Sequence, residues 1–194
     1  MHKEKPAMSI RRMFNNAVSI VFTFIKFSIM KLFLGSGFHF KPICRFSPNV
    51  VTEFEHGSHV SIGNRTRIHS GCKLKARKGA TLTLADDVVF TYNCMINCRD
   101  SVTIGEGTSM GPNACIYDHD HDFRAGLDEL RFKTAPVVIG KNCWIAAGTV
   151  ILMGTTIGDN CMIGAGCILK GDIPANSVVT QKRETVIRPW EVRA

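Results

Sequence analysis

Aliphatic side chains recur at every sixth position along the C-terminal part of the chain. From residue 139 the sequence reads IGKNCW, IAAGTV, ILMGTT, IGDNCM and IGAGCI, so that each hexad begins with isoleucine: Ile139, Ile145, Ile151, Ile157 and Ile163. The fifth position of each hexad is Cys or Thr. A period of six matches neither an α-helix nor a simple strand. It predicts short strands that turn at regular corners, with aliphatic side chains stacked inward from coil to coil.

The same spacing occurs earlier in the chain, in three sets of three: Ile62, Ile68, Leu74; Leu84, Phe90, Ile96; and Ile104, Met110, Ile116. Three hexads make one triangular coil, so residues 60–173 predict about five coils. Successive coils are expected to lie about 4.8 Å apart, which is the strand spacing of a sheet. The predicted molecule is therefore a β-strand prism.

One segment interrupts the hexads. Between Ile116 and Val137 the chain reads YDHDHDFRAGLDELRFKTAP, which places His119 and His121 among three aspartates. An excursion from the corner of a solenoid is a common place for functional residues. Imidazole titrates near neutral pH and can take a proton from an alcohol. We interpret the segment as a candidate catalytic loop, and a solvated polar loop is the alternative.

Charge and cysteine content narrow the partners and the compartment. The formal net charge is +8, which favours anions: nucleic acid, an acidic membrane face or a phosphorylated cofactor. No nucleic-acid-binding motif is present, so no nucleic acid partner is expected. Most of the eight cysteines occupy small or inward positions of the hexads, and no CxxC pair exists. They are interpreted as small hydrophobic residues of a cytoplasmic protein.

The most apolar stretch of the chain, residues 17–34, precedes the hexads and contains Lys26 and Lys31. It predicts a helix that covers the open first coil, or one that rests on the inner face of the cytoplasmic membrane, and the two interpretations are compatible. No signal-peptide cleavage pattern follows it. The predicted organisation is a cap over residues 1–56, a β-helix over 57–173 with a loop at 118–136, and a closing segment at 174–194.

The order of motifs PNACIYDH, PVVIGKNCWIAAGTVI, TIGDNCMIGAGCIL and DIPANSVV resembles the hexapeptide-repeat O-acetyltransferases. The likeness is to the maltose and galactoside acetyltransferase group and to enzymes that acetylate capsular or lipopolysaccharide sugars. The resemblance covers roughly residues 57–174. It implies a left-handed parallel β-helix, although general rules favour right-handed crossovers. It also implies a homotrimer with active sites between subunits, acetyl-CoA as acyl donor, and no metal.

The resemblance implies that His119 is the general base, because it lies just after the coil that ends in the PN-type hexad. His121 is the second candidate. In the implied mechanism the base takes the proton of a substrate hydroxyl, whose oxygen attacks the thioester directly. A backbone N–H near the coil that follows Trp144 would stabilise the oxyanion.

Residues that contact the donor are also implied by the resemblance. The backbones of Ala147 and Ala165 are expected along the pantetheine arm, and Lys170 and Arg188 near the phosphates of the nucleotide. The alternative interpretation is that both alanines are ordinary hexad residues and that both basic side chains are solvated at the surface. After DIPANSVV the chain departs from the family pattern and reads TQKRETVIRPW, which weakens the assignment of Arg188.

On the acceptor side, Trp144 is expected to wall the site near the thioester, and Asn93 matches an asparagine that lines the sugar pocket in relatives. An acidic position a few residues later is Arg99 here. The acceptor class therefore stays open. A lipid-linked saccharide or nucleotide sugar is favoured over a small free sugar or serine, and longer acyl donors are compatible with the sequence.

Two other classes of protein share this pattern. A zinc-dependent hydratase of the γ-carbonic-anhydrase type needs three histidines that converge on the metal, and His69, His119 and His121 are the candidates. A non-enzymatic β-helical scaffold predicts uninterrupted coils. The histidine-bearing excursion therefore favours the acetyltransferase over the scaffold.

Overall fold

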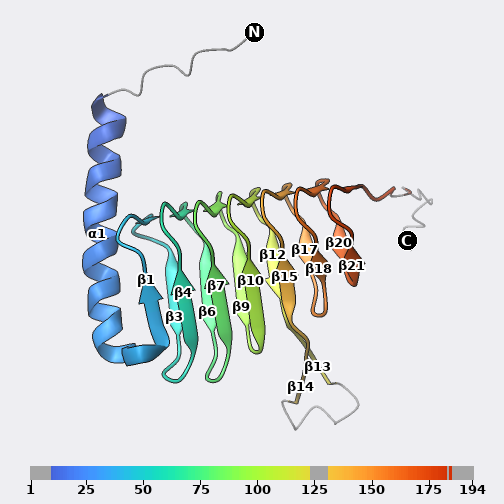
Figure 1. Cartoon of the computed structure of the whole chain (residues 1–194), viewed down its shortest axis with the longest axis horizontal. Coiled ribbons are helices and arrows are strands. Elements are labelled where there is room, and N and C mark those ends of the chain that lie inside the picture. Colours follow the sequence, from blue (N-terminus) through green and yellow to red (C-terminus); the bar gives the residue numbers. More distant parts are fainter. Residues whose placement is uncertain (1–9, 123–130, 183, 185–194) are drawn as a thin grey trace, which may run out of the picture.

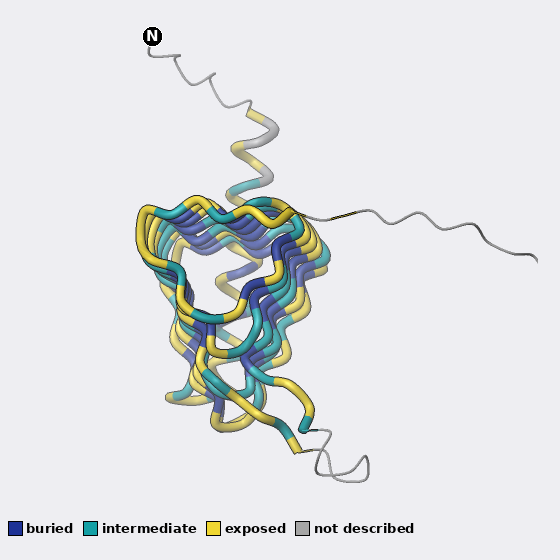
Figure 2. Tube along the Cα trace, turned by 90° about the vertical axis from the view of Figure 1, so that its right-hand side faces the viewer, coloured by how far each residue is buried: buried dark blue, intermediate teal, exposed yellow. Residues whose placement is uncertain are grey.

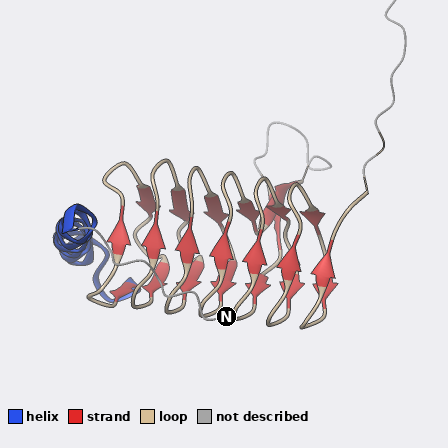
Figure 3. Ribbon diagram, turned by 90° about the horizontal axis from the view of Figure 1, so that it is seen from above, coloured by secondary structure: helices blue, strands red, loops and turns tan. Residues whose placement is uncertain are grey.

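Three parallel sheets form the sides of a prism in the computed structural model, which describes residues 10–122, 131–182 and 184 (Figures 1 and 3). Sheet A contains, in order, β1 (Phe38–Phe40), β4 (His59–Ile62), β7 (Thr81–Leu84), β10 (Ser101–Ile104), β15 (Val137–Ile139), β18 (Thr156–Ile157) and β21 (Asp172–Ile173). Sheet B contains β2 (Arg45–Phe46), β5 (Arg67–Ile68), β8 (Val89–Phe90), β11 (Ser109–Met110), β16 (Trp144–Ile145), β19 (Met162–Ile163) and β22 (Val178–Val179). Sheet C contains β3 (Val51–Phe54), β6 (Lys73–Ala76), β9 (Met95–Cys98), β12 (Cys115–Tyr117), β17 (Val150–Ile151) and β20 (Ile168–Leu169). The prediction of a parallel β-helix is confirmed.

The hexad aliphatics form the core of the prism. Ile139 of β15 is in register with Ile157 of β18, and Ile145 of β16 with Ile163 of β19. These four side chains are buried, and buried residues line the inner wall of the stacked coils (Figure 2). Each aliphatic residue therefore packs against its counterpart one coil away, as the period of six predicts.

The first coil begins earlier than the sequence predicts. Strands β1, β2 and β3 form a complete coil from residues 38–54, which the predicted boundary at residue 57 placed in the cap. Phe38 pairs with Val60 and Phe46 with Ile68, so aromatic residues occupy the positions that aliphatics hold elsewhere. Phe40, Phe46 and Thr52 pair with Ile62, Ile68 and Leu74, so the spacing of six is kept in this coil. Aromatic and polar residues at these positions hide the repeat of aliphatic residues, and the β-helix has one coil more at its start than the five predicted.

Asparagine side chains support the edge between sheets A and B. Asn142, Asn160 and Asn176 have positive φ angles of 53°, 57° and 60° at equivalent corners of successive coils. Asparagine tolerates this left-handed conformation better than most residues. The side-chain amide of Asn160 donates to Oδ1 of Asn176 at 3.1 Å. Repeated asparagines at this edge thus turn the chain and link neighbouring coils.

Helix α1 (Ile10–Leu34) lies across the open end of the prism and is joined to β1 by the short 3-10 helix η1 (Gly35–Gly37) (Figure 1). Its side chain Phe27 is buried edge-on against Phe38 and Phe46, with ring centroids 5.3 and 4.8 Å away. The Thr23 hydroxyl accepts a hydrogen bond from the backbone N–H of Phe46 at 2.9 Å. Because the first coil has no neighbour on this side, α1 covers its hydrophobic end and pairs one of its backbone groups.

The interruption in the repeat is a hairpin that leaves the edge between sheets C and A. Strands β13 (His119–His121) and β14 (Phe132–Thr134) pair antiparallel, with His119 opposite Thr134. They project from the fourth coil, between β12 and β15 (Figure 1). Residues 123–130 lie outside the described part of the chain. The prediction of an extruded loop at this position is confirmed.

Candidate active site

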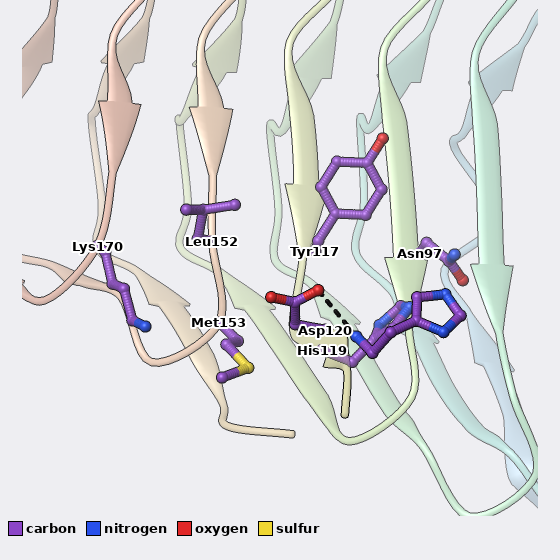
Figure 4. A pocket seen from close by; sticks show the side chains of 8 residues that line it. Asn97, Tyr117, His119, Asp120, Leu152, Met153 and Lys170 are labelled. Carbon is purple, nitrogen blue, oxygen red and sulfur yellow. Dashed lines mark hydrogen bonds between the residues drawn. The ribbon is translucent and has the colours of Figure 1, made fainter. Parts of the chain in front are cut away.

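A pocket of about 330 Å³ lies at the edge between sheets C and A, at the base of the hairpin. It collects side chains from the carboxyl ends of successive sheet C strands and from β13, as Figure 4 shows: Asn97, Tyr117, His119, Asp120, His121, Leu152, Met153 and Lys170. Four segments far apart in sequence meet here because each coil returns to the same edge after three strands. The site is therefore built by the stacking of coils.

Asp118 anchors the base of the hairpin to the coil before it. Its side chain is completely buried. One oxygen accepts the backbone N–H of Asp100 at 2.7 Å, and both oxygens lie 2.9 Å from the backbone N–H of Arg99. A buried carboxylate needs such donors, because burying it without partners is costly. Asp118 is therefore held in place as an acceptor-only group.

The same carboxylate orients His119. Nδ1 of His119 lies 2.9 Å from Oδ1 of Asp118, and the imidazole is only 7% exposed. An ionised carboxylate only accepts hydrogen bonds, so Nδ1 must carry the proton. In the neutral ring Nε2 is then unprotonated, and no described residue donates to it. A carboxylate that fixes the tautomer in this way prepares the second nitrogen to act as a base.

Phe132 of β14 holds both histidine rings. Its ring centroid lies 5.5 Å from that of His119, edge-on, and 4.6 Å from that of His121. The guanidinium of Arg99 lies over the same phenyl ring, 3.5 Å from the centroid, which is a cation–π arrangement. Burial lowers the pKa of Arg99, and the nearby Arg77 adds to this effect. Arg99 therefore supports the hairpin from behind Phe132.

His121 has a different environment from His119. It is exposed and lines the same pocket, but its ring contacts only Phe132 among the described aromatic groups. The carboxylate next to it, Asp120, accepts the backbone N–H of His121 at 2.8 Å. The structure thus distinguishes the two candidate bases: only the imidazole of His119 is paired with a buried carboxylate.

Asn97 is a pocket residue that the sequence did not single out. It lies on β9, in register with Tyr117 of β12. Its Oδ1 atom is buried and has no hydrogen-bond partner among the described residues. An unpaired buried acceptor is costly unless a ligand supplies a donor. No sequence signal marks Asn97, because it occupies an ordinary sheet position and only the stacking of coils brings it beside His119.

The structure brings together some of the predicted site residues. Lys170, expected near the donor phosphates, lines the same pocket as His119 and is exposed. Leu152 and Met153, which the sequence did not single out, form the apolar wall between them. Arg188 lies outside the described residues.

Other predicted residues lie on different parts of the prism. Asn93, Ala147 and Ala165 are exposed at the edge between sheets B and C, at the opposite end of the sheet C strands from His119. The backbone N–H of Gly166 donates to Ala147 at 2.8 Å, which places the two alanine corners in adjacent coils. Trp144 is half exposed on sheet B. Within one chain, none of these four residues lines the His119 pocket.

The three histidines of the zinc alternative do not converge within one chain. His69 lies on a separate pocket with Asn16, Ser19 and Arg45, and its ring packs against Tyr92 at 5.3 Å. Burial and the neighbouring guanidinium of Arg67 lower its pKa. Among the described residues, no group of three or more His, Cys, Asp or Glu side chains is arranged to hold a metal ion.

Comparisons with known proteins agree with the fold and the repeat. The family model described as bacterial transferase hexapeptide (six repeats) matches residues 136–171. Nodulation protein L of Rhizobium meliloti (strain 1021) is 42% identical over 106 residues, which cover 52% of this chain and 56% of that protein. The putative lipopolysaccharide biosynthesis O-acetyl transferase WbbJ of Escherichia coli (strain K12) is 26% identical over 141 residues, 68% of this chain and 72% of that protein.

Among solved structures, the N-acyltransferase AntD from Bacillus cereus superposes with a TM-score of 0.65 at 18% identity, covering 85% of this chain and 90% of that chain. That likeness shows the fold. The chain spans about half the length of the first curated relatives that it matches. The resemblance to the hexapeptide-repeat acetyltransferases is therefore confirmed: residues 136–171 match the family's repeat, and the chain shares its fold with the solved structure of AntD.

Proposed function

We propose that this protein is an acetyl-CoA-dependent O-acetyltransferase that acts on a hydroxyl of a sugar or saccharide precursor. The observation that carries the proposal is the Asp118–His119 pair, 2.9 Å apart, at the wall of an open pocket. A buried carboxylate that holds a histidine tautomer is typical of a general base. The named relatives support the same class, because they include a putative O-acetyl transferase of lipopolysaccharide biosynthesis.

The chemistry is a direct transfer. Nε2 of His119 takes the proton of the acceptor hydroxyl as its oxygen bonds to the thioester carbonyl carbon. The tetrahedral oxyanion collapses with cleavage of the C–S bond, and the imidazolium returns its proton to the departing thiolate. The acetyl ester and the free thiol of coenzyme A are the products. Proton transfer of this kind contributes roughly 10²- to 10⁴-fold, and it needs no covalent enzyme intermediate and no metal.

The donor and acceptor occupy different parts of the pocket in this proposal. Lys170 has the charge to bind a phosphate of coenzyme A, and Leu152 and Met153 suit the apolar part of its arm. The orphan oxygen of Asn97 suits a hydroxyl donor on the acceptor. AntD, whose structure contains coenzyme A and dTDP-4-amino-4,6-dideoxyglucose, supports a nucleotide-linked sugar as the acceptor class.

The complete site includes residues of a neighbouring copy. Trp144, Ala147 and Ala165 lie on faces that one chain cannot bring to its own His119. A cyclic trimer of prisms places the edge of one copy against the face of the next, and a symmetric assembly repeats this contact three times. We therefore assign these residues to the donor groove between copies. The catalytic role of His119 does not depend on that assignment.

The test is acetyl transfer by the full chain, followed by mass spectrometry of saccharides incubated with acetyl-CoA. His119→Ala should lower kcat by roughly 10²- to 10⁴-fold, whereas His121→Ala should retain most of the activity. Alkaline hydrolysis releases the acetyl group of an ester but leaves an amide, and amino sugars included in the panel thus separate O- from N-transfer. Full turnover by His119→Ala would refute the base assignment. Hydration of carbon dioxide that is lost on zinc removal and restored by zinc would support the hydratase class instead.

A further inference from the structure

The outward face of helix α1 is almost wholly apolar. Among the described side chains of this helix, every exposed residue except Lys31 is apolar: Ile10, Met13, Phe14, Ala17, Val18, Val21, Phe22, Phe24, Ile25, Ile29, Leu32 and Phe33. The spacing of Phe14, Val18, Val21, Ile25, Ile29 and Leu32 places them on one stripe, on the side of the helix opposite to Thr23 and Phe27. A soluble helix that covers a core on one side normally presents charged residues on the other.

Lys26, Lys31 and Thr23 of α1 are directed toward the β-helix instead. The ammonium group of Lys26 donates to the carbonyl of Val50 at 3.1 Å, and that of Lys31 to the carbonyl of Phe38 at 2.7 Å. Thr23 is buried against Phe46. The charged ends of both lysines are bound to the edge of the first coil. They therefore do not oppose contact between lipid and the opposite side of the helix.

Composition alone would allow α1 to cross a bilayer. Residues Asn16–Gly37 have a mean hydropathy of 1.9 and form the one helix in the described part of the chain that is long and apolar enough to span. The tertiary structure points to a different placement. The helix packs along the first coil through Thr23, Lys26 and Phe27, and a helix attached side-on to a polar prism cannot also be surrounded by hydrocarbon. A helix that lies in the membrane interface can place its apolar stripe in lipid and keep its other face on the first coil.

Charge indicates which surface the stripe would meet. The chain has a formal net charge of +8, and Arg11 and Arg12 follow directly on the first residue of α1. Basic residues beside an apolar helical stripe favour a membrane surface that carries anionic lipids. A second copy of this chain carries the same net charge of +8 and offers no such charge complementarity.

We propose that α1 lies flat in the interface of an anionic membrane, with its apolar stripe in the lipid and the prism standing on it. In Figure 1 the helix crosses the end of the prism at a steep angle to the direction in which the coils stack, so the coils then rise away from the membrane. This proposal does not rest on the proposed activity. Helix α1 covers the first coil, whereas the His119 pocket lies at the base of the hairpin that leaves the fourth coil.

The test is flotation of the full chain with vesicles of phosphatidylglycerol and, in parallel, of phosphatidylcholine. We expect co-flotation with the anionic vesicles, weaker binding to the neutral ones, and a loss of binding in 1 M salt that is partial because the apolar stripe persists. Ile25 is 55% exposed at the centre of the stripe, and Val178 is 71% exposed on the last coil. Ile25→Glu should lower vesicle partitioning at least about tenfold, whereas the matched Val178→Glu should leave it unchanged.

Circular dichroism and thermal unfolding of both variants would show that each is folded, since both positions face solvent. The proposal is overturned if the full chain floats with neither vesicle, or if Ile25→Glu binds as well as Val178→Glu. It is also overturned if the lipid-free chain self-associates through the stripe, with Ile25→Glu splitting that assembly by mass photometry and lipid binding absent. That outcome would assign the stripe to a second copy.

Discussion

The carboxylate of Asp118 joins two coils: it binds His119 Nδ1 at 2.9 Å and the backbone N–H of Asp100, one coil away, at 2.7 Å. It therefore acts both as a structural anchor and as the group that orients the proposed base. Because both tasks use the same two oxygens, the orientation of His119 depends on the stacking of the coils beneath it.

Asp118→Asn separates these two tasks. Its amide is neutral and cannot accept from both sides, so we expect kcat to fall about 10- to 100-fold, as for lost partners of functional histidines, with little change in KM for acetyl-CoA. The free energy of unfolding should fall by about 1–3 kcal/mol, since backbone donors lose a charged acceptor. Asp120→Asn, two residues away on the exposed side, is the control. A lower melting temperature with unchanged kcat would show that Asp118 is only structural.

Asn97 offers a prediction in which activity and stability move in opposite directions. Asn97→Leu keeps the size of the side chain and removes a buried oxygen that has no partner among the described residues. We expect stability to be unchanged or raised by about 1 kcal/mol. KM for the acceptor should rise about tenfold, the effect of one lost hydrogen bond, with KM for acetyl-CoA unchanged. Steady-state kinetics and thermal unfolding measure both; a stability loss with normal kinetics would remove Asn97 from the acceptor site.

A site shared between copies predicts complementation. His119→Ala and Trp144→Ala should each be nearly inactive as homotrimers. Mixed trimers from co-expression contain some sites with an intact histidine from one copy and an intact tryptophan from the next. Random assembly gives about one quarter of such sites in an equimolar mixture, so about a quarter of wild-type activity should return. If each variant is inactive alone and mixing restores nothing, both residues act within one chain; an active Trp144→Ala homotrimer would remove Trp144 from the site.

The cap contact can be tested through stability. Phe27 is fully buried between α1 and the first coil. Phe27→Ala should destabilise the protein by about 3–5 kcal/mol, as for other buried aromatic truncations. Phe33 lies on the same helix but is 76% exposed, and Phe33→Ala should change stability by less than about 0.5 kcal/mol. Chemical unfolding of both variants provides the comparison, and equal effects would mean that α1 does not hold the end of the prism.

The eight cysteines predict slow thiol chemistry in the native state. All are free, and all but Cys115 are buried. Burial raises the pKa of Cys44 to about 12, with a smaller contribution from the charge of Asp86, and burial also raises the pKa of Cys115. Alkylation requires a thiolate that the reagent can reach, and seven of the thiols are buried, so little labelling is expected at pH 8 until the protein is unfolded, when all eight should react. Mass spectrometry counts the labels, and rapid labelling of several native thiols would contradict this packing.

The sequence by itself determined the architecture. Isoleucines such as Ile139 and Ile157, in the same place in successive coils, specify one inward position per strand, and this pattern is sufficient because coils contact only their neighbours. The position of the excursion followed in the same way, since Ile116 and Val137 mark where the repeat stops and resumes. The sequence identified both His119 and His121 as candidate bases, but it did not show that their surroundings differ.

The tertiary structure decided which residues of different coils come together, which a sequence repeat does not show. Residues of different coils contact one another when they lie at the same edge of the prism. The first coil keeps the spacing of six at Phe40, Phe46 and Thr52, but these residues are not aliphatic, so the repeat did not reveal it. The same rule brought Asn97 and Lys170 to His119 and left Asn93 at the far end of the same sheet. Contacts across coils are distant in sequence, so only the stacked structure shows which side chains share a pocket.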